Sequence, residues 1–270
     1  IWDALDKRLI LARDPAGIKP LYVYQSETLV AFSSEIKGLV PILSPLPSLD
    51  RDAFMTFLSL GYTGAEKSLL DGVQALPPGS LMSFDKLGYR KQTFWQPTRN
   101  KDIKKADEAV NMFLDIWPNI LESTMISDVP IGVLQSGGID SSLISMGLSK
   151  TKRLKSFTAS FGSASYDESS LALQIQNASG AESTNIEVGV GEGLEDTFTS
   201  VVHHFDGQVA DSSGIALYKL CEQVKHHVSV ALTGDGADEY FAGYPTYSIA
   251  PIAALIHKII PHKLASSAGQ

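Results

Sequence analysis

Residues 136–142 read Ser-Gly-Gly-Ile-Asp-Ser-Ser, a combination of residue types that suits the binding of an anion such as pyrophosphate. Gly137 and Gly138 let backbone N–H groups approach phosphate oxygens, because glycine carries no side chain. A helix that begins within this run would direct its positive end at the same anion. The hydroxyl donors are Ser136, Ser141 and Ser142. The alternative is a serine-rich helix cap that follows a glycine turn.

Asp140 lies inside this run, and phosphate oxygens would repel its carboxylate unless a cation lay between them. The sequence therefore predicts Mg²⁺ bridging Asp140 and pyrophosphate. There is no Gly-x-x-x-x-Gly-Lys-Ser/Thr sequence, so transfer of the γ-phosphate at a P-loop is not supported. A site that holds the β and γ phosphates leaves the α-phosphorus open to attack. We therefore expect an enzyme that uses ATP to adenylate its substrate and releases pyrophosphate.

Residues 233–239 read Thr-Gly-Asp-Gly-Ala-Asp-Glu and pack three acids and two glycines into one short segment. The functional interpretation makes Asp238 a second Mg²⁺ ligand and places Asp235, the candidate catalytic residue, near the reacting acyl group. The alternative is a solvated acidic turn. A further loop, residues 159–162, could receive adenine through its backbone groups, which makes Ala159 a candidate nucleotide contact.

The elements around these loops alternate between strand and helix. Short apolar runs predict buried strands, and apolar residues at helical spacing predict the helices between them. Such alternation is typical of a doubly wound parallel sheet, in which ligands bind beyond the carboxyl ends of the strands. The expected strands cover residues 131–134, 154–161, 185–188 and 228–232, and the expected helices cover 106–125, 141–150, 168–178 and 216–226.

The first part of the chain has a different pattern, with short β-rich runs between turns. Strands separated by so few residues are expected to be antiparallel neighbours, since parallel pairing needs a long crossover. We therefore predict a β meander with small helices, one of them at residues 50–60. A polar stretch at 96–106 reads as a linker. The expected strands are residues 8–12, 21–24 and 28–32, followed by a hairpin of 80–84 with 90–94.

The composition of this 270-residue chain argues against some classes of binding partner. A net charge of -8 and the lack of a basic stripe argue against nucleic acid. Residues 248–261 form the longest apolar stretch, but Pro251, His257 and Lys258 interrupt it, so no membrane span is expected. The single cysteine, Cys221, is expected to be a core thiol, and a cytoplasmic location is expected. The adjacent histidines at 203–204 and 226–227 are expected to be hydrogen-bonded or surface residues rather than metal ligands.

Several motifs in order along the chain resemble the glutamine-dependent asparagine synthetase family. Its synthetase domain carries SGGxDSS and a later G-[DE]-G-x-D-E, which correspond to residues 136–142 and 234–239. Tyr-Phe-Ala-Gly-Tyr follows at 240–244. In the first part, Arg13 to Tyr22, Ser34 to Leu39 and Leu76 to Gly79 are similar to the closing part of the family's glutaminase domain.

The resemblance implies an incomplete N-terminal nucleophile-type glutaminase domain at 1–95, a linker at 96–106, and the first part of an ATP-pyrophosphatase domain at 107–270. It also implies that Asp140 and Asp238 hold Mg²⁺, and that Asp211 and Ser212 lie near the substrate carboxylate or the adenosine. The residues that it assigns to ATP and pyrophosphate are Leu134, Gln135, Ser136, Gly137, Gly138, Asp140, Ser141, Ser142, Ala159, Thr233 and Gly234.

The reaction that the resemblance implies is synthesis of asparagine. The side-chain carboxylate of aspartate attacks the α-phosphorus of ATP, and ammonia derived from glutamine then displaces AMP. Ala210 stands where the best-known members have an arginine, so the acid could instead be another one, as in β-lactam synthetase or in amidotransferases of surface-polysaccharide gene clusters. A noncatalytic fragment that binds nucleotide is a further alternative.

The family also has an N-terminal cysteine nucleophile and a lysine beyond the region that corresponds to Gln270. This sequence contains neither, so we expect a chain truncated at both ends. The expected partners are small molecules, namely an acid and glutamine or ammonia, and a homodimer is left open.

Overall fold

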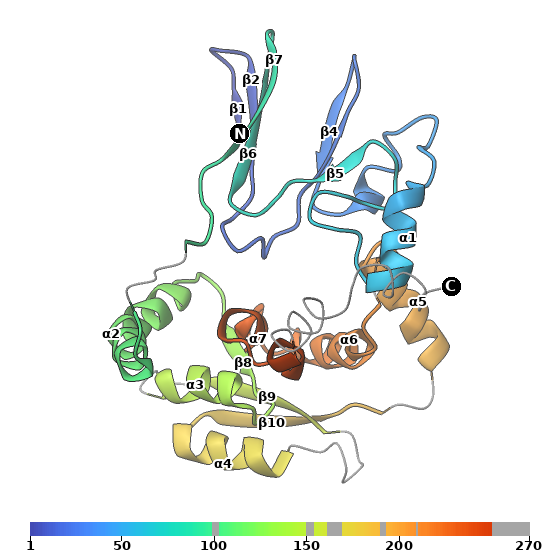
Figure 1. The fold of residues 1–270 in the computed structure, drawn as a ribbon. Coiled ribbons are helices and arrows are strands. Elements are labelled where there is room, and N and C mark those ends of the chain that lie inside the picture. The colour runs from blue at the N-terminus through green and yellow to red at the C-terminus, as the bar shows by residue number, and fades with distance from the viewer. Residues whose placement is uncertain (99–102, 150–153, 161–168, 190–192, 209, 250–270) are drawn as a thin grey trace, which may run out of the picture. The chain divides into compact units, whose positions relative to one another are not determined.

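The computed structural model describes residues 1–98, 103–149, 154–160, 169–189, 193–208 and 210–249. The chain forms two compact units. The first unit is Ile1–Glu108 with Gly191–Lys219, and the second is Ala109–Val190 with Leu220–Gln270. Figure 1 labels the helices and strands of each unit.

The first unit contains two antiparallel sheets. One has the strand order β1-β2-β6-β7, formed by Trp2–Asp3, Arg8–Ala12, Ser80–Asp85 and Gly88–Thr93. The other has the order β4-β3-β5, formed by Val30–Ser33, Tyr22–Gln25 and Val73–Ala75. Buried residues of both sheets share one hydrophobic cluster, which contains Leu11, Val23, Leu76, Met82 and Phe84. The expected β6–β7 hairpin is confirmed, with Asp85 paired to Gly88.

The antiparallel pairing expected between residues 8–12 and residues 21–24 is wrong. Strand β2 pairs with β1 and β6, whereas β3 pairs with β4 and β5. The connection between β2 and β3 is held by the Arg13 side chain, which donates to the backbone oxygens of Lys19 at 3.0 Å, Leu76 at 2.7 Å and Gly17 at 2.8 Å. This connection is an ordered loop rather than a tight turn, so it can lead from one sheet to the other.

Helices complete the first unit. They are the 3-10 helix η1 (Ile36–Gly38), α1 (Arg51–Leu60), α5 (Leu194–His204) and the first residues of α6 (Ser213–Val224). Helix α1 confirms the short helix expected at 50–60. Its first residues are capped by Asp50, whose carboxylate accepts from the Ala53 N–H at 2.9 Å, and Gly61 ends it with a φ of 83°.

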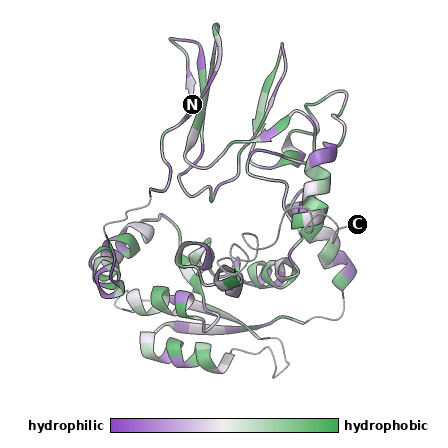
Figure 2. Cartoon of the chain, viewed as in Figure 1, coloured by the Kyte–Doolittle hydropathy of each residue, from purple (hydrophilic) through white to green (hydrophobic). Residues whose placement is uncertain are grey.

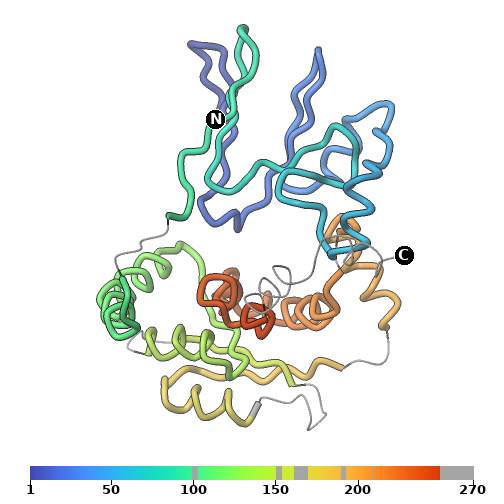
Figure 3. Tube along the Cα trace, viewed as in Figure 1, coloured from blue at the N-terminus to red at the C-terminus, as the bar shows by residue number. Residues whose placement is uncertain are grey.

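The second unit is built on a four-stranded parallel sheet with the order β10-β9-β8-β11. These strands are Glu182–Glu187, Lys155–Ser160, Ile131–Leu134 and Val230–Leu232. Helices α3 (Ile139–Gly147) and α4 (Ser169–Ser179) are the crossovers between β8, β9 and β10, and Figure 3 traces this path. The two helices contact each other, as expected of successive right-handed crossovers on one face. The predicted α/β fold class, in which antiparallel sheets are followed along the chain by a parallel sheet, is thus confirmed.

Helix α2 (Ala106–Thr124) confirms the helix expected at 106–125 and leads into this unit. Helix α2 packs against α3 at Gly147. A side chain at this position would collide with Trp117 and Leu121 of α2, so glycine allows the two helices to approach each other. Leu121 and Val133 belong to the cluster beneath β8. Figure 2 shows hydrophobic and hydrophilic residues mixed along α2. No helix among the described residues is both long enough and apolar enough to cross a membrane.

We predict that Asp50→Ala lowers the free energy of unfolding by about 1 kcal/mol at neutral pH, because α1 loses its N-cap. The hydrogen bond from the Ala53 N–H, followed by that from Lys67, lowers the pKa of Asp50 below its ordinary 3.8. A lowered pKa means that the stabilisation is complete above 3.8 and disappears as the pH falls through the lower folded-state value. Urea unfolding at pH 7 and at pH 2 measures both effects.

The matched control is Asp52→Ala, which removes an exposed carboxylate from the same first turn. An Asp52→Ala loss as large as that of Asp50→Ala would attribute the effect to helix charge and not to the cap.

Candidate active site

The two glycine-containing loops singled out in the sequence emerge from adjacent strands. Strand β8 pairs with β9 on one side and with β11 on the other, although β11 comes last in the chain. In strand order this is the switch point, where successive connections leave in opposite directions and a crevice opens at the carboxyl ends. Residues 135–138 follow β8 and residues 233–236 follow β11. The sheet therefore places both loops at the position where such folds bind ligands.

The two loops are in direct contact at Gly234. A Cβ atom on this residue would lie 2.8 Å from the Cβ of Asp140 and 3.0 Å from the backbone nitrogen of Ser141. Both distances are shorter than normal van der Waals contact, so only glycine fits without a shift of α3. The acidic loop thus lies against the first turn of α3, the helix that carries Asp140.

The first turn of α3 is suited to an anion. Its N-cap is Gly138, which makes no side-chain cap hydrogen bond, so the first N–H groups of the helix lack that partner. Gly137 has a φ of 93°, a conformation that favours glycine. The Ser136 and Ser141 hydroxyls lie 3.1 Å apart, and the Ser142 hydroxyl donates to the Gly138 oxygen at 2.6 Å. Backbone donors and hydroxyls therefore gather at one helix end.

The side chain of Gln135 shapes this loop from below. It is 1% exposed, and its amide lies 3.2 Å from the hydroxyls of Ser141 and Ser142 and 2.5 Å from that of Ser145. With the amide turned so that both ends are satisfied, its oxygen accepts from the Gly137 N–H at 3.2 Å and its nitrogen donates to Ser145. The Gln135 side chain is thus occupied within the protein, and its geometry gives it a positioning role in the loop.

This polar network continues under the sheet. The Thr158 hydroxyl donates to the backbone oxygen of Gln135 at 2.9 Å, and Gln176 donates to the hydroxyls of Thr158 at 2.9 Å and Ser156 at 3.1 Å. Ser145, Thr158 and Gln176 were not singled out in the sequence. The i, i+4 spacing of Ser141 and Ser145 was an available signal, but the others come from distant elements. These hydrogen bonds between buried polar groups hold the loop in one conformation, although the side-chain oxygen of Gln176 has no partner among the described residues.

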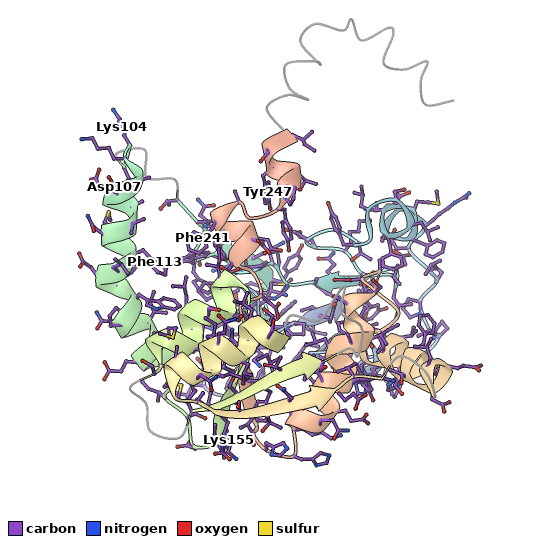
Figure 4. All side chains as sticks on the ribbon, turned by 90° about the horizontal axis from the view of Figure 1, so that it is seen from below. Lys104, Asp107, Phe113, Lys155, Phe241 and Tyr247 are labelled. Carbon is purple, nitrogen blue, oxygen red and sulfur yellow. The ribbon has the colours of Figure 1, made fainter. Side chains whose placement is uncertain are left out.

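The acidic loop has its own internal supports. Gly236 has a φ of 89° and begins α7 (Ala237–Phe241), and the Asp235 N–H donates to the Thr233 hydroxyl at 3.3 Å. Asp238 lies against Gly243, where any side chain would collide with its carboxylate. Phe241 meets Phe113 of α2 edge to face, with ring centroids 6.0 Å apart (Figure 4). These contacts hold both ends of the short helix α7, which carries Asp238.

The donor set suits Mg²⁺ better than a metal with an all-protein shell. The residues described by the structure include no group of three or more His, Cys, Asp or Glu side chains that could hold a metal. Mg²⁺ is usually held by one or two carboxylates together with substrate phosphates and waters. Asp140 and the acidic loop, brought together by the Gly234 contact, offer carboxylates of this kind beside an anion site.

The remaining candidate residues lie outside the two glycine-containing loops. Ala159 is near the carboxyl end of β9, next to β8, whereas residues 161–162 of that loop lie outside the described residues. Asp211 and Ser212 belong to the first compact unit, whereas the two loops belong to the second. The Asp211 carboxylate accepts from the Ser213 N–H at 2.9 Å, and this bond lowers the pKa of Asp211. It stabilises the turn that leads into α6.

Two expectations about Cys221 and the histidines have different outcomes. Cys221 lies on α6, but it is exposed, so the expected core thiol is wrong. The residue as a whole is exposed, but its thiol group is partly shielded from water, which raises the pKa of the thiol, and the negative charge of Asp235 raises it further. His203, His204, His226 and His227 are all exposed, as expected.

Family models match both parts of the chain. The model described as asparagine synthase matches residues 119–269, and the model described as glutamine amidotransferase domain matches residues 1–95. The chain belongs to the asparagine synthase family. Residues 191–219 lie within the asparagine synthase match, although they fold with the first compact unit.

The relatives of this chain carry related names. It is 33% identical to "Asparagine synthetase [glutamine-hydrolyzing] 1" of Bacillus subtilis, over 92% of this chain and 39% of that protein. It is 29% identical to the "Putative asparagine synthetase [glutamine-hydrolyzing]" of Mycobacterium tuberculosis, over 100% of this chain and 42% of that protein. The chain thus spans about two fifths of the length of these relatives. A solved glutamine phosphoribosylpyrophosphate amidotransferase from B. subtilis covers 70% of this chain and 34% of its own at 11% identity, with a TM-score of 0.19.

We predict that Gly234→Ala destabilises the second unit by about 1–3 kcal/mol, because the added methyl group forces the acidic loop away from α3. Thermal unfolding followed by circular dichroism measures the loss. The matched control is Gly189→Ala, since a Cβ at Gly189 meets nothing within 4 Å. Equal stability of Gly234→Ala and the wild type would show that the two loops are not in contact.

Proposed function

We propose that the protein to which these residues belong adenylates a carboxylic acid with ATP and converts the adenylate to an amide with ammonia derived from glutamine. The observation that carries this proposal is the contact between the two loops at the switch point, where Gly234 lies against Asp140. Membership of the asparagine synthase family and the amidotransferase match at 1–95 support it. We assign 1–95 to the glutaminase domain, 96–106 to a linker and 107–270 to the ATP-pyrophosphatase domain.

The residues of the loop after β8 bind the phosphates in this proposal. The first N–H groups of α3 and the hydroxyls of Ser136, Ser141 and Ser142 donate to pyrophosphate oxygens. Gln135 holds these donors in place from below, and Leu134, Ala159, Thr233 and Gly234 border the nucleotide through their backbones. Backbone donors already in position need no reorganisation as charge develops on the leaving group.

Asp140 and Asp238 hold Mg²⁺ in this proposal, and Asp235 lies near the reacting acyl group. When bound, Mg²⁺ neutralises charge on the phosphates and on the departing pyrophosphate. In the first step a carboxylate oxygen of the acid forms a bond to the α-phosphorus, and the bond from that phosphorus to the β-phosphate oxygen breaks. In the second step the nitrogen of ammonia forms a bond to the acyl carbon and gives up one proton to solvent, and the bond from that carbon to the phosphate oxygen of AMP breaks.

Aspartate is the first candidate acid, with asparagine, AMP and pyrophosphate as products, because the relatives quoted above are named asparagine synthetases. A second candidate is another acid, adenylated in the same way. It is favoured by the segment 210–212, which reads Ala-Asp-Ser and offers a carboxylate and hydroxyl but no cation for an α-carboxylate group. Asp211 and Ser212 contact the acid in either case.

We predict that Asp140→Asn removes the preference for Mg·ATP over metal-free ATP. The wild type should bind Mg·ATP more tightly, and the variant should lose about tenfold in affinity, the size of one charge-assisted contact. Isothermal titration with Mg·ATP and with ATP in EDTA measures both affinities. Asp128→Asn, an exposed aspartate before β8, is the control and should behave as wild type. Unchanged Mg·ATP affinity in Asp140→Asn would disprove the assignment of the loop.

We predict that the whole protein catalyses exchange of labelled pyrophosphate into ATP only when its acid is present, because adenylation is reversible before ammonia reacts. A panel of acids that includes aspartate separates the two candidates. Exchange with aspartate supports asparagine synthesis, and exchange with another acid alone supports the second candidate. No exchange with any acid would contradict adenylation.

A further inference from the structure

The segment that contains α5 and the start of α6 folds with the part of the chain that matches the amidotransferase model, although its own sequence matches the asparagine synthase model. Residues 191–219 and 1–108 form one compact unit. A Cβ on Gly61, at the end of α1, would lie 3.3 Å from the Cβ of Ala210, and the Thr63 hydroxyl bonds to the Gln208 side chain at 3.2 Å. Gln208 and Ala210 therefore lie against the end of α1 and the residues that follow it.

The strongest link in this contact is Asp206. Its carboxylate accepts from the backbone N–H groups of Ile36 at 2.6 Å and Lys37 at 3.1 Å, the first residues of η1. The preceding residue, Glu35, makes no side-chain cap bond to that helix. A residue 170 positions later in the chain thus supplies the cap for η1. The Asp206 side chain is 8% exposed, so these bonds are shielded from water.

Lys37 completes the link. Its ammonium group lies 3.4 Å from the Asp206 carboxylate, 2.8 Å from Glu35 and 3.3 Å from the backbone oxygen of His204, which ends α5. Burial lowers the pKa of Lys37, but the bonds and charges of Glu35 and Asp206 outweigh burial and raise it. The positive charge therefore stays opposite the carboxylate that caps η1.

The backbone at Asp206 is bent to make this contact. Asp206 has a φ of 53° and Gly207 a φ of 73°, so two consecutive residues adopt the left-handed conformation that is uncommon for residues other than glycine. The Gly207 N–H donates to the Val202 oxygen at 2.8 Å and closes the end of α5. This ending turns the Asp206 carboxylate toward η1.

We propose that Asp206 is a positioning residue: its bonds to η1 hold the segment 210–212, which we propose binds the acid, against residues 1–95, which match the amidotransferase model. The proposal rests on the function proposed above, in which Asp211 and Ser212 contact the acid. Hydrogen bonds from the Ser213 and Gly214 N–H groups to Asp211, and from Ile215 to Ser212, hold these residues at the start of α6. Asp206, Gln208 and Ala210 are held against η1 and the end of α1 shortly before Asp211, so a displacement of η1 shifts the residues proposed to bind the acid.

The test uses Asp206→Gly and Asp206→Asn. Glycine removes the carboxylate without strain at a positive φ, so the fold is retained, whereas asparagine keeps one acceptor and should give an intermediate effect. Asp196→Asn, an exposed aspartate in the first turn of α5, is the matched control. Hydrogen exchange of backbone amides is followed by NMR in this chain, and pyrophosphate exchange is measured in the whole protein.

In Asp206→Gly the amides of Ile36 and Lys37 should exchange at least about tenfold faster, because a charge-assisted hydrogen bond is lost at each. The amides of Ser213 to Ile215 should become faster in the same variant. The KM for the acid should rise severalfold, with the KM for ATP unchanged, and Asp206→Asn should recover part of each effect.

Faster exchange at Ile36 and Lys37 with no change at Ser213 to Ile215 would overturn the proposal, since Asp206 would then be only a local helix cap. A change in the KM for ATP equal to that for the acid would overturn it as well. If the wild-type protein shows no acid-dependent activity, the proposed function fails. The exchange rates of the amides of Ser213 to Ile215 still decide whether Asp206 holds the segment 210–212 in place.

Discussion

The pairing of β8 with β11 is the constraint on which the candidate site depends. Each strand leads into one of the two loops. The segment after β8 carries backbone donors, hydroxyls and Asp140, and the segment after β11 carries three further acids. Parallel pairing joins two segments that are far apart in the chain, with Val230 opposite Ile131 and Leu232 opposite Val133. The contact at Gly234 is possible only because the two strands end at the same edge.

The loop after β8 owes its shape to a buried polar network rather than to its glycines alone. Glycines permit the conformation, but permissive residues do not select one conformation from many. Selection comes from Gln135, which is surrounded by serine hydroxyls of α3 and held through Thr158 to β9 and Gln176. A network of this kind is costly unless each group finds a partner. The oxygen of Gln176 is buried without a hydrogen bond among the described residues.

The boundary between the two sequence families and the boundary between the two compact units differ. Residues 191–219 match the asparagine synthase model but fold with residues 1–108. The unit boundary falls within α6, so one continuous helix leads from the segment that follows Asp206 into the second unit. The segment 210–212 therefore belongs by sequence to the asparagine synthase match and by contacts to the unit that contains the amidotransferase match.

Local sequence determined much of this protein. The strand, glycine turn and helix at 131–147, the β6–β7 hairpin and the capped helix α1 were predictable because each depends on residues close in the chain. Tertiary structure alone decided that β2 and β3 lie in different sheets, that Cys221 is exposed, and that Asp206 caps η1. It also placed β11 beside β8 and Gln176 beneath the loop. Each of these involves contacts between distant segments, which no local pattern of residues specifies.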